Sequence, residues 1–227
     1  MATFCLLHGA WHDPACWDEL AAELGTRGHE VVAPELPLHD PGAGWAERIQ
    51  PALDALDALA GRGFSAGRVV VVGHSMGAGY APFVAAGLAD PVLVLLCPGF
   101  GTLRAGFPWP PTRADGTCVW ERRSAVDALY GRLPAATANA LAQRLRPMAP
   151  PADAPPARPS IPATAVYAAE DALFDPEEER RKIQARPGTQ GIEIPGGHFP
   201  MIEHPAGLAD LLARLAGERG APADRPE

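Results

Sequence analysis

The chain has 227 residues, of which 47% are hydrophobic, and its formal net charge is −8 at pH 7. This length and composition allow one sizeable core, which favours a single α/β domain over two domains. The acidic balance argues against nucleic acid or an anionic membrane surface as a partner, because both attract a basic face that this sequence lacks.

The sequence also lacks a stretch of about 18 apolar residues, and residues 3–7 begin a strand pattern without a signal segment before it. We therefore expect a cytoplasmic protein that makes no membrane contact. The four cysteines Cys5, Cys16, Cys97 and Cys118 have no metal-ligand spacing. Neither a disulfide framework nor a metal site is expected, and the sequence indicates no cofactor.

Apolar runs typical of buried strands alternate with segments of helical period, which predicts a mainly parallel sheet with helices on both faces. Strands are expected at residues 3–7, 30–33, 69–72, 92–97, 163–168 and 191–194. Helices are expected at residues 13–27, 43–60, 76–88, 176–186 and 205–216. Functional residues should gather where the parallel strands end.

The centre of this pattern is the run of four valines that precedes Gly73-His74-Ser75-Met76-Gly77. A buried strand, a serine flanked by two glycines and a following helix match the Gly-x-Ser-x-Gly nucleophile elbow. The glycines are needed because a Cβ atom would collide with backbone at so sharp a turn. Ser75 is therefore predicted to be a catalytic nucleophile.

Residues 100–159 break the alternation, because they are rich in proline and contain only two helical patterns, at residues 123–133 and 134–146. Connections of this length are usually functional, so we interpret this segment as a lid over the site. The core then comprises residues 1–99 and 160–217, and residues 218–227 form a flexible tail.

Two further loops carry chemistry. His198 lies in a glycine-rich loop after the last strand and is the predicted general base, while Asp171, directly after the preceding strand, is predicted to orient its ring. Glu170 should point away from the site, and Asp175 suits the N-cap of the next helix. The order Ser75, Asp171, His198 is the order of the α/β-hydrolase arrangement.

The loop after the first strand, His8-Gly9-Ala10-Trp11, is expected to lie beside the elbow. We predict that the backbone amides of Ala10 and Met76 form the oxyanion hole.

These motifs, together with Trp17 and Leu145-Arg146-Pro147, resemble the α/β-hydrolase superfamily over residues 3–215. Within it the chain is similar to the branch of small hydroxynitrile lyases and plant methylesterase-like proteins with their bacterial relatives. The resemblance implies either ester hydrolysis or cyanohydrin cleavage. Lyase members carry a threonine where this chain has Gly9 and a lysine where it has Phe199. Because both marks are absent, we expect a serine esterase.

The expected substrate is a small to medium, mostly uncharged ester, with aromatic esters included. Aromatic and apolar residues of the lid could line its pocket or simply pack the lid down. Predicted substrate contacts are Gly9, Trp11, His74, Phe100, Leu103, Trp109, Trp120, Tyr130 and Phe199. A carboxylate bound by Arg104, a lyase, cyclase or cofactor-independent oxygenase activity, and a non-catalytic receptor remain alternatives. The sequence is compatible with a monomer or a homodimer.

Overall fold

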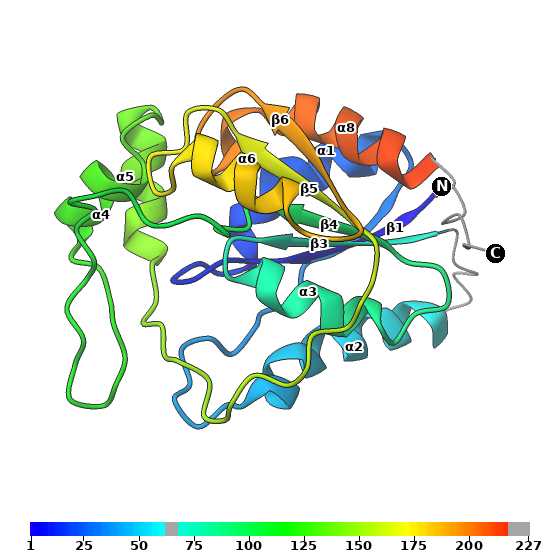
Figure 1. Ribbon diagram of the computed structural model, residues 1–227, viewed down its shortest axis with the longest axis horizontal. Coiled ribbons are helices and arrows are strands. Elements are labelled where there is room, and N and C mark those ends of the chain that lie inside the picture. The colour runs from blue at the N-terminus through cyan, green and yellow to red at the C-terminus, as the bar shows by residue number, and fades with distance from the viewer. Residues whose placement is uncertain (62–67, 218–227) are drawn as a thin grey trace.

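The computed structural model describes residues 1–61 and 68–217, which form one six-stranded parallel sheet in the order β2-β1-β3-β4-β5-β6 (Figure 1). The chain adds β2 on one side of β1 and the later strands on the other side, beginning with β3, so the strand order reverses between β1 and β3. At such a point a crevice forms at the carboxyl ends of the strands. The strands are β1 (Thr3–Leu7), β2 (Glu30–Val32), β3 (Val69–His74), β4 (Val92–Leu96), β5 (Ala163–Ala168) and β6 (Thr189–Ile194).

Helices cover both faces of the sheet, with α1 and α8 on one side and α2 and α3 on the other (Figure 1). The helices of the core are α1 (Asp18–Thr26), α2 (Trp45–Gly61), α3 (Gly77–Ala85), α6 (Pro176–Gln184), α7 (Pro200–Glu203) and α8 (Pro205–Gly217). The lid, our name for residues 100–159, contains α4 (Arg122–Leu129) and α5 (Ala135–Arg144). The predicted parallel sheet with helices on both faces is thereby confirmed.

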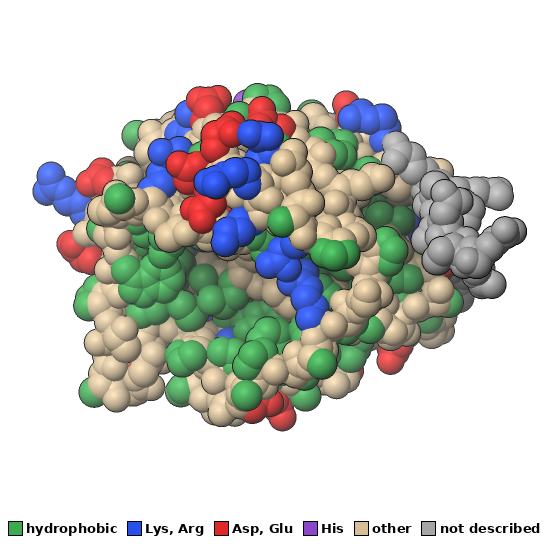
Figure 2. Space-filling model, viewed as in Figure 1, with side chains coloured by type: hydrophobic (Ala, Val, Ile, Leu, Met, Phe, Trp, Pro, Cys, Tyr) green, Lys and Arg blue, Asp and Glu red, His purple; other side chains and the backbone are tan. Residues whose placement is uncertain are grey.

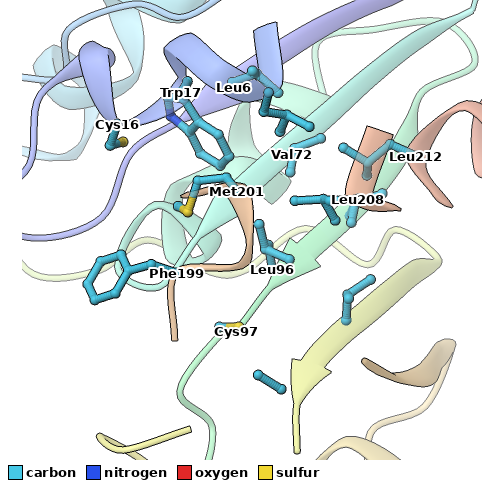
Figure 3. Packing of buried hydrophobic residues seen from close by; sticks show 14 of the residues in the cluster. Leu6, Cys16, Trp17, Val72, Leu96, Cys97, Phe199, Met201, Leu208 and Leu212 are labelled. Carbon is cyan, nitrogen blue, oxygen red and sulfur yellow. The ribbon is translucent and has the colours of Figure 1, made fainter. Parts of the chain in front are cut away.

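The valine run is explained by burial on both sides of β3. Val70 and Val72 belong to the hydrophobic cluster under α1 and α8, whereas Val71 belongs to the cluster under α2 and α3. Figure 3 shows the first cluster, in which Leu208 and Leu212 of α8 pack near Val72. Successive side chains of a strand point to opposite faces, so a central strand covered on both faces is apolar throughout.

Several boundaries differ from the predicted ones. The helix predicted at residues 13–27 is a 3₁₀ turn (Pro14–Trp17) followed by α1. The helix predicted at residues 76–88 is α3, which begins at Gly77 and ends at Ala85. The chain after Ala85 continues in a turn with hydrogen bonds of the i to i+3 type. Residues 200–203, where no helix was predicted, form α7, which Pro200 can begin because a first helical residue needs no free amide. The predicted tail lies outside the described residues. So does Gly63, which was expected to help end the helix at residues 43–60.

Hydrophobic side chains surround a hollow in the surface (Figure 2). In the same view of Figure 1, this hollow lies between the lid loop that precedes α4 and the extended segment that returns from α5 to β5. Among the described helices, none has the length and apolar character that crossing a membrane would require.

One buried cation fastens that returning segment to the core. The side chain of Arg48 in α2 is fully buried and donates to the carbonyl oxygens of Ala149 and Pro150 at 3.1 and 2.9 Å. It also donates to the carbonyls of Asp40 and Ala43 and to the hydroxyl of Tyr80. Five acceptors around one guanidinium satisfy its donors without a carboxylate in contact.

We expect Arg48→Met to lower the free energy of unfolding by about 3 kcal/mol, because it removes these bonds and leaves buried carbonyls without a donor. Urea unfolding followed by circular dichroism would measure the loss. Arg180→Met, in α6, where the side chain is partly exposed and pairs with Glu177, is the control and should change stability by less than about 0.5 kcal/mol. An Arg48→Met protein as stable as the wild type would contradict this role.

Candidate active site

Ser75 lies at a strained turn between β3 and α3. Its φ angle is +50°, in the left-handed region that side chains other than glycine rarely adopt, and its amide donates to Leu96 O at 2.9 Å. A Cβ on Gly73 would lie 2.5 Å from Gly77 O, and a Cβ on Gly77 would meet the carbonyl oxygens of Leu7 and His8. The two glycines are therefore needed for steric reasons, as the elbow motif requires.

His198 and Asp171 are in direct contact. Nδ1 of His198 lies 2.7 Å from Oδ2 of Asp171, and both side chains are buried. The other carboxylate oxygen of Asp171 accepts from the backbone amides of Leu173 and Phe174 at 2.8 and 3.1 Å. Both oxygens of this carboxylate are thus engaged, and its orientation is fixed.

The protonation of this pair follows from its surroundings. Burial acts to raise the pKa of Asp171, but the His198 ring and the hydrogen bonds from His198, Leu173 and Phe174 outweigh it and bring the pKa below its usual value. Asp171 is therefore ionised at neutral pH and can only accept hydrogen bonds. Nδ1 of His198 must carry the proton, which leaves Nε2 without one in the neutral ring.

The two neighbouring carboxylates have other partners. Asp175 caps α6 by accepting from the amides of Glu177 and Glu178, which confirms the predicted N-cap. Glu170 is exposed and pairs with Arg132 of the lid at 2.6 Å. Of the three carboxylates in this loop, Asp171 is the one that contacts His198.

Ser75 and His198 line one small pocket, which has an empty volume of about 220 Å³ including its mouth. Four of the nine predicted substrate contacts, Gly9, Trp11, His74 and Phe199, line it too. The pocket is also lined by Ala10, His12, Leu129 and Leu173. None of these lining residues carries a carboxylate, an ammonium or a guanidinium group.

The other five predicted contacts do not line this pocket. Leu103 makes a β-bridge to Phe174, Trp109 and Trp120 pack edge to face on Trp11, and Tyr130 is buried against Phe199. Phe100 lies under the Arg186 guanidinium, 3.7 Å from the ring centroid. These side chains hold the lid together and onto the core, the alternative that the sequence left open.

We call residues 8–13 the oxyanion loop after their predicted role, and buried histidines hold this loop. Nε2 of His8 accepts from the amide of Leu36 at 3.0 Å, so Nδ1 of a neutral His8 carries the proton and donates to Gly9 O, also at 3.0 Å. This carbonyl belongs to the same peptide group as the amide of Ala10. Met76, the second predicted donor, is the N-cap residue of α3.

A stack of rings lies behind His198. Nε2 of His74 contacts the carbonyl oxygen of His198 at 2.8 Å, and the ring of Phe199 lies within 5.4 Å of the rings of His12, His74, Tyr130 and His198. Figure 3 shows Phe199 among the residues of the first hydrophobic cluster, on the chain that continues to Met201. Nδ1 of His74 is buried without a hydrogen-bond partner.

The four cysteines are free and buried. Cys97 follows β4 with a φ angle of +44°, and burial raises the pKa of its thiol. Its sulfur, a carboxylate oxygen of Asp171 and a ring nitrogen of His198 lie within 4.8 Å of one another, a set that could hold a soft divalent ion. Such an ion would compete with the bond between Asp171 and His198.

The sequence did not predict His12, Leu129 or Leu173 as pocket residues. Leu129 is in α4 and Leu173 follows Asp171, and both resemble ordinary core leucines in sequence. His12 follows the motif His8-Gly9-Ala10-Trp11 directly, and this proximity was the one available signal.

The buried histidines predict a loss of stability in acid. Burial lowers the pKa of His8 and His12 to about 4, whereas unfolded histidines protonate near 6.5. Between these values the unfolded chain binds more protons, so stability falls as the pH falls from 6.5 to 4, by on the order of 3 kcal/mol for each histidine. Urea midpoints measured from pH 7.5 to 4.5 would test this, and a flat profile would contradict it.

Comparison with known proteins places this geometry in a family. A "Carbendazim hydrolyzing esterase" from Nocardioides sp. is 28% identical over 95% of this chain and 100% of its own. A "Pyrethroid hydrolase" from Sphingobium wenxiniae is 25% identical over 93% and 86%. The crystal structure of methylesterase MES16 from Arabidopsis matches with a TM-score of 0.73, at 20% identity over 96% and 99%. The model of the alpha/beta hydrolase family matches residues 6–211, and the chain belongs to that family.

Proposed function

We propose that the protein is a serine esterase that cleaves small to medium, mostly uncharged esters through an acyl-enzyme. The observation that carries the proposal is the 2.7 Å contact of His198 with Asp171 at a pocket that Ser75 also lines. A neutral imidazole with an unprotonated Nε2 is the general base that a serine nucleophile requires.

In the proposed reaction, Ser75 Oγ attacks the ester carbonyl while His198 Nε2 takes its proton. The amides of Ala10 and Met76 donate to the oxyanion. The bond to the alcohol then breaks, and His198 returns the proton to the leaving oxygen. A water molecule, deprotonated by His198, attacks the acyl carbon and releases the acid and free Ser75. Asp171 stabilises the imidazolium in both halves of the reaction.

The preference for uncharged substrates follows from the pocket lining, which has no ionised side chain apart from the catalytic histidine when it is protonated. Arg104, which could have bound a substrate carboxylate, directs its Nε to the carbonyl oxygens of Asp171 and Phe174 at 3.0 and 3.3 Å. This side chain braces the loop that carries Asp171.

The named relatives support ester chemistry, because two curated proteins that align along most of this chain are an esterase and a hydrolase. Cyanohydrin cleavage has less support. A departing cyanide needs a nearby cation, and the position after the catalytic histidine holds Phe199, which is buried among aromatic and imidazole rings. A Cβ on Gly9 would lie 3.0 Å from Ser75 Cβ, so the threonine of lyases does not fit without a shift.

We expect Ser75→Ala to lower kcat for p-nitrophenyl esters by at least about 10³-fold while the fold is kept. The serine of the lid, which does not line the pocket, gives a matched control, Ser124→Ala, which should keep wild-type turnover. Carbendazim and a pyrethroid belong in the substrate panel, because relatives are named for them.

Equal turnover in Ser75→Ala would exclude this nucleophile. A folded wild type without turnover, but labelled at Ser75 by a fluorophosphonate, would redirect the search to other acyl groups or cyanohydrins. No turnover together with no labelling would favour a receptor.

The small pocket also predicts a preference for short acyl groups. Among p-nitrophenyl esters from acetate to octanoate, we expect kcat/KM to be highest at acetate to butyrate. Leu129→Ala should move the optimum to longer chains, because it removes a side chain from the pocket lining. Leu133→Ala, in the lid but outside this lining, should leave it in place. An octanoate optimum in the wild type would contradict the size argument.

A further inference from the structure

A chain of two hydrogen bonds runs from Tyr130 of the lid through His12 to Ala10 of the oxyanion loop. The hydroxyl of Tyr130, at the end of α4, lies 2.7 Å from Nε2 of His12, and Nδ1 of the same ring lies 2.7 Å from Ala10 O. A carbonyl oxygen only accepts, so Nδ1 of His12 carries the proton. Nε2 of the neutral ring then accepts from the Tyr130 hydroxyl, and the direction of both bonds is determined.

Two histidine side chains, His8 and His12, bond to the peptide groups that flank Ala10. His8 holds the carbonyl of Gly9, in the peptide that carries the Ala10 amide, and His12 holds the carbonyl of Ala10 itself. With a donor on each carbonyl, neither peptide plane can rotate without breaking a buried bond. The amide that would face the oxyanion is thereby kept in one orientation, and such preorganisation is the source of oxyanion stabilisation.

The next residue in the loop needs this support, because Trp11 has a φ angle of +63°. Its indole Nε1 donates to Cys118 O at 3.2 Å, and its carbonyl accepts from the amide of Arg146 at 2.9 Å. Both partners belong to the lid. A strained conformation persists only where its surroundings impose it, and here the lid supplies much of that constraint.

Tyr130 is placed for this task and not for substrate contact. It is 1% exposed, it does not line the catalytic pocket, and its ring packs on Phe199 with centroids 5.2 Å apart. Replacing its hydroxyl by hydrogen therefore removes the bond to His12 and leaves the ring packing in place.

We propose that Tyr130, acting through His12, is a positioning residue for the oxyanion hole, so that full activity requires the lid to be seated on residues 10–12. The inference rests on the proposed esterase function. It assigns to the lid a part in stabilising the transition state, in addition to covering the pocket.

The first test is Tyr130→Phe. We expect kcat for the best p-nitrophenyl ester to fall about tenfold with KM within about twofold of the wild type, because ground-state contacts are unchanged. The inhibition constant of an aryl trifluoromethyl ketone, which forms an oxyanion on Ser75, should weaken by a similar factor. Tyr167→Phe, on β5 and remote from the pocket, is the matched control and should leave both values unchanged.

Two variants of His12 distinguish a positioning role of this side chain from a packing role. His12→Asn keeps a donor near Ala10 O and should retain more activity than His12→Leu, which has none. A pair of variants equal in kcat and in ketone binding would overturn the proposal, as would a folded Tyr130→Phe protein with wild-type values.

A readout independent of esterase activity is the ¹⁵N spectrum of histidine-labelled protein. It should show His12 protonated at Nδ1 in the wild type, and Tyr130→Phe should shift its Nε2 resonance. This result would stand even if the protein proved not to be an esterase. A His12 protonated at Nε2 would refute the hydrogen-bond chain directly.

Discussion

The strained turn at Ser75 is the constraint on which the site depends. A left-handed backbone at a residue with a side chain costs on the order of 1–3 kcal/mol, and it persists because Gly73 and Gly77 let β3, α3 and the end of β1 approach to contact distance. The amide of Ser75 is fixed on Leu96 O of the neighbouring strand. The sheet therefore holds the serine in place, and the other predicted catalytic groups lie in the loops that follow β1, β5 and β6.

The lid contacts each of those loops. Tyr130 bonds to His12 in the loop after β1, Arg104 holds the loop of Asp171, and Arg132 pairs with Glu170 and Glu203 on either side of the catalytic pair. Glu203 in turn accepts from the amide of Gly197 in the histidine loop. The lid, which the sequence predicts to be a cover for the site, is thus connected to the loops around every predicted catalytic residue other than Ser75.

Burial gives these loops a common electrostatic character. His8, His12 and His74 are removed from water, and burial lowers the pKa of each, so they are neutral at pH 7 and act as hydrogen-bonding groups with a defined tautomer. Neutral neighbours do not repel the positive charge that His198 would take up in the proposed reaction. Asp171, the ionised group in contact with His198, is left to stabilise that charge.

The sequence by itself determined the sheet, the elbow and the order of Ser75, Asp171 and His198, because strand periodicity and steric limits on glycine are local properties of the chain. It also indicated why Asp175 caps a helix. Only the tertiary structure decided which lid residues reach the pocket. Leu129 lines it whereas Trp109, Trp120 and Tyr130 do not, since an irregular 60-residue segment has no period from which its packing could be read. The same holds for His12 and Arg48, whose partners Tyr130 and Ala149 lie 118 and 101 residues away along the chain.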